Sequence, residues 1–212
     1  MARVRLPADR RQSLLAAARR VFASKGYEAA TVSEIVAEAG VAHGTFYLYF
    51  PSKRAAVVQL ADEFHRRLAE AVMSAYRPDR PLVESVRPTV EAAFRVCADN
   101  VDLIRLLDLD VARDLEACRE MEAAPAHREF QAWMEGIIGQ HAAREGLALD
   151  PEMLARIIIW MMREATYECF VLGGGREVDR YIEAISGFLE AALLGLGSPS
   201  QATTDQRRGK GK

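Results

Sequence analysis

Apolar residues recur at helical spacing along almost the whole chain, and this periodicity constrains the fold more than any other feature. Near the start, Leu14, Ala18, Val21 and Phe22 fall on one face of a helix. Runs of β-branched residues that alternate with polar ones, typical of strands, are almost absent. The sequence therefore predicts an all-α protein.

Capping residues and glycines divide the N-terminal part into helices. The first helix is expected from about Asp9 to the residue before Gly26. Thr31 begins a second helix with a capping box that Glu34 completes, and a short third helix is expected at about residues 42–48. Ser52 is the expected N-cap of a long fourth helix that runs to about residue 76.

The rest of the chain is predicted to continue as helices. Prolines leave open whether the fifth helix begins at Pro81 or is kinked at Pro88. Further helices are expected at about residues 100–118, 127–144, 152–172 and 176–194, and Asp150 followed by Pro151 is a clear start signal. The three glycines at 173–175 are interpreted as a helix–helix connection, because no strand precedes them and no Lys-Ser/Thr pair follows.

Charge is distributed unevenly along the chain. Residues 1–54 carry a net charge of +5, whereas the whole chain carries −2. A basic N-terminal part joined to an acidic remainder indicates that the N-terminal part binds a polyanion, although a solvated basic helix has the same pattern.

A helix-turn-helix unit is predicted where Gly40 separates the second helix from the short third one, whose position suits entry into the major groove. The run that follows is more specific: Gly44-Thr45-Phe46-Tyr47, then Tyr49-Phe50 and Ser52-Lys53. Over residues 10–57 the chain resembles the TetR family of regulators. The resemblance implies a three-helix DNA-binding domain at residues 1–52, joined by the long helix to a larger helical ligand-binding and dimerisation domain at 53–197. Residues 198–212 are polar and basic, and are predicted to be a disordered tail.

The predicted DNA contacts follow from the motif and from side-chain chemistry. Small Gly44 permits a close approach to DNA, tyrosine hydroxyls reach phosphates, and His43 matches the family's variable base-reading position. Lys53 is a cation in the first turn of a helix, where the dipole favours acids, and this misfit suggests that it holds a phosphate. The alternative is a solvated amphipathic face. The expected contacts are Thr31, His43, Gly44, Thr45, Tyr47, Leu48, Tyr49 and Lys53.

An effector pocket in the C-terminal domain is predicted from large apolar side chains and from polar groups within apolar segments. Ordinary core packing explains the same apolar stripe, so both interpretations stay open. The candidate pocket residues are Phe94, Asn100, Leu103, Leu107, Phe130, Trp133, Met134, Ile137, Met162, Arg163 and Tyr167.

The last two long helices are apolar on more than one side, and the resemblance implies that they form the dimer seam. The candidate interface residues are Ile158, Tyr181, Ile185, Phe188 and Leu189.

Other classes of function lack support in the sequence. Cys97, Cys118 and Cys169 form no metal-binding or disulfide pattern, and buried free thiols are favoured over a redox sensor. His65, His127 and His141 supply acid–base groups, but no catalytic, cofactor-binding or metal-ligand spacing accompanies them. We therefore expect neither an enzyme nor a bound cofactor or metal. No apolar run is long enough to span a membrane and no signal peptide is evident, so a cytoplasmic location is predicted.

The resulting expectation is a transcriptional repressor that binds a palindromic operator as a homodimer and is released by a small, apolar effector. The identity of the effector and of the operator, and the choice between repressor and activator, stay open at this stage. A helical binding or scaffold module is the rival interpretation, but it leaves the run from Gly44 to Lys53 unexplained.

Overall fold

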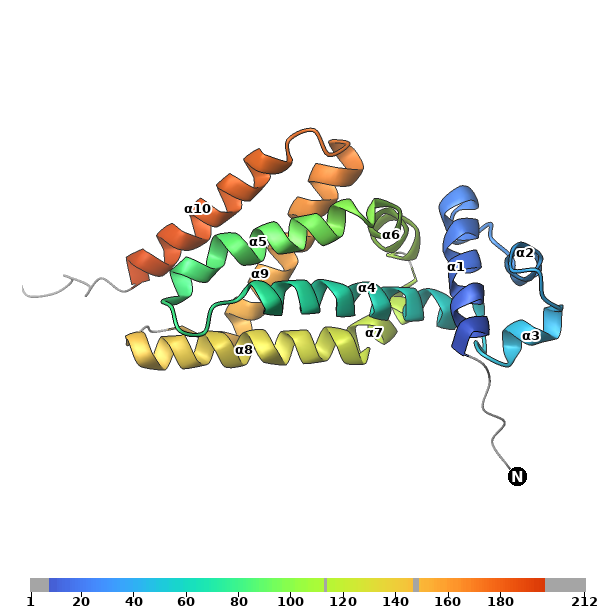
Figure 1. The fold of residues 1–212 in the computed structure, drawn as a ribbon, viewed down its shortest axis with the longest axis horizontal. Coiled ribbons are helices and arrows are strands. Elements are labelled where there is room, and N and C mark those ends of the chain that lie inside the picture. The colour runs from blue at the N-terminus through green and yellow to red at the C-terminus, as the bar shows by residue number, and fades with distance from the viewer. Residues whose placement is uncertain (1–7, 113, 147–148, 197–212) are drawn as a thin grey trace, which may run out of the picture.

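The computed structural model describes residues 8–112, 114–146 and 149–196. These ranges contain helices and no strand, so the all-α prediction is confirmed. Figure 1 shows a small cluster of N-terminal helices at one end of an elongated molecule and a larger bundle at the other, with α4 running from one to the other. The predicted tail at 198–212 lies outside the described residues.

The N-terminal cluster consists of α1 (Ala8–Lys25), α2 (Val32–Glu38) and α3 (His43–Tyr47), and is called the reading head below. The predicted capping box is present: Thr31 Oγ1 accepts from the Glu34 amide, while the Glu34 carboxylate accepts from the Thr31 amide. Gly26 ends α1 with a φ of 79°, a conformation that favours glycine. Local signals therefore set these helix ends.

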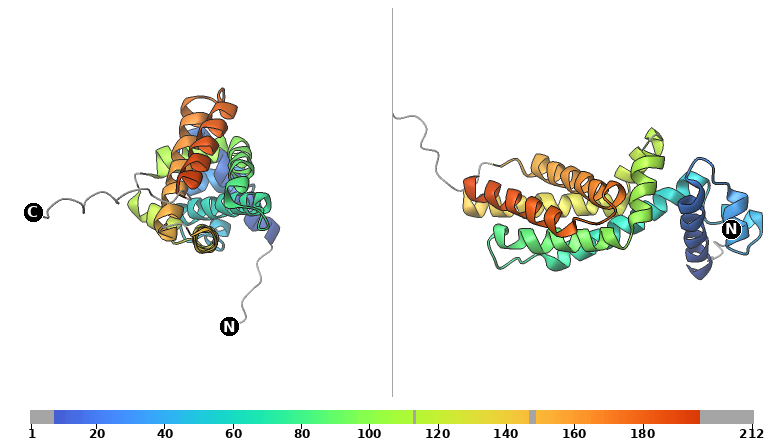
Figure 2. Two further views of the ribbon diagram at one scale, coloured as in Figure 1. Left: turned by 90° about the vertical axis from the view of Figure 1, so that its left-hand side faces the viewer. Right: turned by 90° about the horizontal axis from the view of Figure 1, so that it is seen from above.

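The body begins with α4 (Lys53–Ala75), whose predicted cap Ser52 accepts from the Ala55 amide at 3.1 Å. It is completed by α5 (Leu82–Ala98), α6 (Val101–Arg105), α7 (Leu115–Glu122), α8 (Pro125–Glu145), α9 (Pro151–Thr166) and α10 (Val178–Leu196). Two segments, Leu106–Val111 and Tyr167–Leu172, are π-helical. The π-helical segment 167–172 links α9 to α10, which packs on α5, while α9 packs on α8, and Figure 2 shows the same bundle from two further sides.

The structure resolves the question about the prolines. Pro81 is the N-cap of α5, so the helix begins directly after it at Leu82, and it continues past Pro88.

One helix prediction was wrong. Residues 100–118 do not form one helix, because α6 passes into the π-helical turn at 106–111 and Asp114 then starts α7. Asp114 accepts from the amides of Glu116 and Ala117 at 3.1 and 3.0 Å, which is a strong local start signal. Apolar periodicity alone did not reveal this break.

Buried apolar side chains form one cluster that extends from the reading head into the body. Phe22, Ile35 and Phe46 belong to its head portion, and Phe64 and Phe94 belong to its body portion. The head is therefore packed against the start of the body through α4. Within the described ranges, no helix combines the length and apolarity that a bilayer span requires.

Candidate DNA-reading surface and effector cavity

The short helix α3 buries one face and leaves the other exposed. Phe46 and Phe50 are 0% and 3% exposed, and their ring centres lie 5.5 Å apart, so they anchor α3 to the core as expected. Tyr47 and Leu48 are 51% and 62% exposed, and His43 is also exposed, with its ring centre 5.5 Å from that of Tyr47. The candidate base-reading side chains thus lie on a common outer face.

The remaining candidates differ in exposure. Gly44 and Thr31 are exposed, whereas Thr45 and Tyr49 are half-buried. A Cβ added at Gly44 would meet no atom within 4 Å, and the φ of Gly44 is not in the left-handed region. Neither packing nor backbone conformation therefore requires glycine at this position in the free protein.

In the free protein, Lys53 has partners that the sequence did not reveal. Its Nζ donates to the carbonyl oxygens of Tyr27 at 2.6 Å, Ala30 at 3.0 Å and Glu28 at 3.2 Å, and it lies 4.5 Å from the centre of the Tyr27 ring. An ammonium group has three donors, so all of them are engaged. Lys53 ties the loop between α1 and α2 to the start of α4, which explains a cation at this position without DNA.

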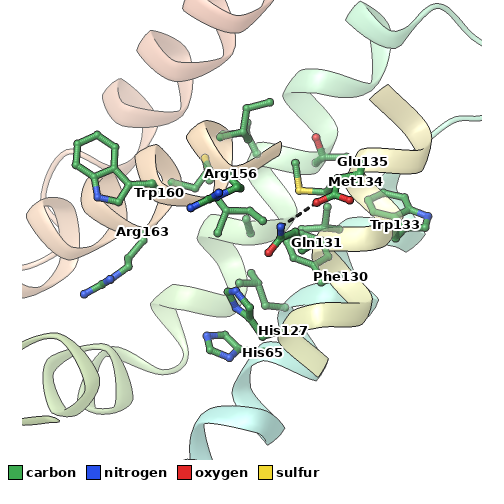
Figure 3. A pocket seen from close by; sticks show the side chains of 18 of the residues that line it. His65, His127, Phe130, Gln131, Trp133, Met134, Glu135, Arg156, Trp160 and Arg163 are labelled. Carbon is green, nitrogen blue, oxygen red and sulfur yellow. Dashed lines mark hydrogen bonds between the residues drawn. The ribbon is translucent and has the colours of Figure 1, made fainter. Parts of the chain in front are cut away.

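The body encloses a cavity of about 880 Å³ between α4, α5, α7, α8, α9 and α10, with the π-helical turn at 106–111 forming part of its wall. This volume lies in the range of pockets that bind small molecules. Most of the lining side chains are apolar, but charged side chains also line the cavity, among them Glu135, Arg156 and Arg163 (Figure 3).

Most of the predicted pocket residues line this cavity. They share large apolar side chains on α8, α9 and the π-helical turn, with one cation: Leu107, Phe130, Trp133, Met134, Ile137, Met162 and Arg163. Arg163 donates to Asp108 at 2.6 Å, so its charge is partnered within the protein. The sequence prediction named no residue of α4, and on α5 it named only Phe94, although both helices line the cavity through residues such as Leu68, Val72 and Val86.

Four predicted pocket residues do not line the cavity. Phe94 and Leu103 are 1% and 2% exposed and belong to the core, where Phe94 packs on Phe170 at 5.9 Å. Tyr167 packs against the same core. Asn100 is buried at the boundary with the reading head, where it accepts from Arg19 at 3.1 Å and donates to the Val96 carbonyl at 2.8 Å. These four side chains contact other parts of the protein instead, and sequence spacing did not reveal those contacts.

The ion pair of Arg19 joins the reading head to the body, and that of Arg54 joins the start of α4 to α7 within the body. The Arg19 guanidinium in α1 donates to both carboxylate oxygens of Asp102 in α6, at 2.5 and 2.6 Å, and this contact lowers the pKa of Asp102. Arg54 pairs with Glu116 and Glu120 of α7 at 2.7 and 3.1 Å. Sequence analysis missed these partners because they are separated by more than 60 residues.

The predicted dimer residues largely face inward. Ile185 is only 8% exposed, Tyr181 packs near Phe94, and Ile158 and Leu189 line the cavity. Of the five, Phe188 is strongly exposed, at 64%. The sequence did not reveal which face of these helices is exposed, since both faces of α9 and α10 are apolar.

The exposed apolar side chains of the last helices lie elsewhere. Met153, Ile157 and Trp160 are 50%, 51% and 67% exposed and share one face of α9. On α10, Phe188 and Leu194 are each 64% exposed. Trp160 also borders the cavity, and exposed apolar side chains of this kind are typical of an association surface.

Comparison with known proteins agrees with this architecture. A family model described as "Bacterial regulatory proteins, tetR family" matches residues 14–60, which span the reading head and the start of α4. YdgC of Bacillus subtilis, an uncharacterized HTH-type transcriptional regulator, is 34% identical over 196 residues, covering 90% of this chain and 95% of YdgC.

Two further relatives are informative. The HTH-type transcriptional repressor AcnR of Corynebacterium glutamicum is 36% identical over 85 residues, which cover 40% of this chain and 43% of AcnR. FadR from Bacillus subtilis, a transcriptional regulator solved in complex with stearoyl-CoA, has the same fold with a TM-score of 0.67 at 23% identity, over 86% of this chain and 96% of that one. With its helix-turn-helix head, its larger helical body and these relatives, the chain belongs to the TetR family of transcriptional regulators.

Proposed function

We propose that this protein is a repressor that binds a palindromic operator as a homodimer and releases it when a small, apolar effector enters the cavity. One observation carries this proposal. The continuous helical segment at residues 101–111 holds the reading head through Asp102 and lines the cavity through Leu107 and Asp108. A ligand in the cavity therefore acts on the same segment that contacts α1.

The DNA contacts are assigned to the outer face of α3. His43, Tyr47 and Leu48 are exposed there, and a short helix with three such side chains matches the geometry of a recognition helix. Gly44 has no side chain, so DNA can approach the backbone of α3 closely. Thr31, Thr45 and Tyr49 are assigned to phosphate contacts at the edge of this face. Lys53 is excluded from this set and positions the loop before α2.

The dimer is assigned to the exposed apolar patch of Met153, Ile157 and Trp160 on α9 with Phe188 and Leu194 on α10. A two-fold axis through such a patch makes the interface self-complementary and repeats the reading head. Two reading heads related by a two-fold axis match a palindromic operator with half-sites one or more helical turns apart.

Release is assigned to a shift of residues 101–111 when ligand occupies the cavity. The shift would be transmitted to α1 through the contact of Asp102 with Arg19, and through α4, which borders both the cavity and the reading head. The resemblance to the repressor AcnR supports the negative sign of regulation. The stearoyl-CoA bound to the fold relative FadR supports an apolar effector.

The test is fluorescence anisotropy of the purified full-length protein on fragments of the region upstream of its own gene, with random competitor DNA and a salt series. Tyr47→Ala and Leu48→Ala should weaken competitor-resistant binding about tenfold or more, as expected for lost groove contacts. Leu115→Ala is the matched control, since Leu115 is 70% exposed but lies on α7. Apolar compounds that raise the melting temperature would then be tested for release of the operator.

Two other outcomes would contradict the proposal. Weak binding that ignores sequence and is unchanged by Tyr47→Ala would assign the chain to helical binding modules instead. Tighter operator binding in the presence of a cavity ligand would reverse the proposed sign and make the effector a co-repressor.

A further inference from the structure

Polar groups around the cavity differ in whether the protein itself satisfies them. Tyr76 lines the cavity, and its hydroxyl already has a partner, since it is hydrogen-bonded to His141 Nε2 at 2.8 Å. Gln131 donates to Glu135 at 2.8 Å. A ligand group that faces such satisfied side chains gains little, because it would have to replace a hydrogen bond that already exists.

His65 is different. It lies on α4 and lines the cavity, and its Nδ1 is completely buried with no hydrogen-bond partner among the described residues. A buried polar atom without a partner is unusual in a folded protein, and a ligand that displaces the neighbouring wall of the cavity could supply the missing hydrogen bond. No other cavity-lining side chain in the described ranges has such an atom.

A second imidazole stands beside the first. The ring of His127, at the start of α8, lies 5.3 Å from that of His65 in an edge-to-face arrangement, and Figure 3 shows the two rings side by side. Phe130, on the next turn of α8, and then Trp133 and Met134 continue the wall from this pair. The cavity thus combines a polar pair with a long apolar wall on one helix.

Burial of the two imidazoles favours their uncharged forms, while the charges of Asp62 and Arg163 act on His65 in opposite directions. Burial is the main cause that lowers the pKa of His65, to about 4, and it also lowers the pKa of His127. Burial likewise raises the pKa of Asp108, across the cavity. Two neutral imidazoles offer both N–H donors and free nitrogen acceptors, so they match a hydroxyl or a carbonyl oxygen without a change of charge.

We propose that His65, with His127 beside it, binds the uncharged oxygen group of an otherwise apolar effector, a hydroxyl or a carbonyl, while the hydrocarbon part lies along Phe130, Trp133 and Met134. This inference rests on the proposed function, since it assigns a chemical class to the effector of the same cavity. It excludes effectors whose buried end is a carboxylate or an ammonium group.

The test is calorimetric titration of the full-length protein at neutral pH with a series of matched chain length: decanol, methyl nonyl ketone, decanoate and decylamine. The two neutral compounds should bind about tenfold or more tightly than the two ions. His65→Phe and His65→Leu replace the imidazole with an apolar side chain of similar size, so they should remove this preference. Tyr76→Phe is the control, since it deletes a cavity hydroxyl that His141 already satisfies, and it should preserve the preference.

A second measurement reports on the histidine directly. The ¹⁵N chemical shifts of the His65 ring should move when decanol is added to the wild type, while those of exposed His43 stay constant. Three results would each overturn the assignment of the polar pair without affecting the proposed function. They are tighter binding of decanoate or decylamine, an unchanged preference in both His65 variants, and ¹⁵N shifts of the His65 ring that do not move. Failure of all four compounds to bind would overturn the cavity as the effector site, and with it the proposed function.

Discussion

The guanidinium of Arg19 in α1 holds the carboxylate of Asp102 in α6 through two hydrogen bonds, and a third bond reaches Asn100. Arg20, the next residue, instead pairs with Glu38 inside the reading head at 2.6 Å. Neighbouring arginines thus serve two different contacts, one between head and body and one within the head.

This pair provides a direct test of coupling. Arg19→Gln should reduce the change in operator affinity that an effector causes by about threefold or more, because the coupling free energy is small and passes through this contact. Arg20→Gln should leave the coupling intact. Operator titrations with and without effector measure both, and equal coupling in the two variants would locate the path elsewhere.

Gly44→Ala should separate stability from DNA binding. A Cβ at this position meets nothing in the free protein, and alanine is the better helix former, so the free energy of unfolding should rise by about 0.5–1 kcal/mol. Operator affinity should fall, because the added methyl group lies on the outer face of α3. Urea denaturation and anisotropy give the two numbers, and an unchanged operator affinity would remove Gly44 from the interface.

Lys53→Met should lower stability more than it alters phosphate contacts. It removes three hydrogen bonds from an ammonium group to the carbonyls of Tyr27, Glu28 and Ala30, so a loss of about 1.5–3 kcal/mol is expected. The dependence of operator affinity on salt should keep its slope, whereas loss of a phosphate contact would reduce the slope by about one. A reduced slope with unchanged stability would restore the phosphate role.

The cavity histidine should make stability depend on pH. The pKa of His65 is about 4 in the folded protein and near its ordinary 6.5 in the unfolded chain. Between these values the unfolded chain binds a proton that the folded protein does not, so stability falls as pH decreases from about 6.5 to 4, by about 1.4 kcal/mol per pH unit. His65→Leu should flatten this slope in urea denaturation, and exposed His43→Leu should not.

The apolar patch on α9 and α10 should control the oligomeric state. Trp160→Glu or Phe188→Glu buries a charge in the proposed interface and should shift the protein to monomers in analytical ultracentrifugation. Ile185→Val, a change at a buried site predicted from sequence as an interface residue, should keep the dimer. Dimers that survive both glutamate variants would exclude this face.

Prediction from sequence succeeded where the cause is local. Thr31, Ser52 and Asp150 each cap a helix by accepting from the amide three residues later, and each cap is present as predicted. The motif from Gly44 to Lys53 also located the reading helix, since its residues lie close together in the chain. The pocket prediction succeeded in part, because α8 turns its large apolar side chains toward the cavity with the expected period.

Failures came where a partner lies far away in the chain. From the sequence, the charge of Lys53 indicated a phosphate contact, whereas in the free protein its ammonium group donates to loop carbonyls within residues 27–30. His65 carried no special signal, because its unpartnered nitrogen exists only once α8 has packed beside α4. The helical class, the caps and the reading motif were determined by the sequence itself, through hydrogen bonds and periodicities spanning a few residues. The tertiary structure alone decided which apolar face lines the cavity, which is left for a partner, and which charges join head to body, because these depend on contacts between segments that chain spacing does not specify.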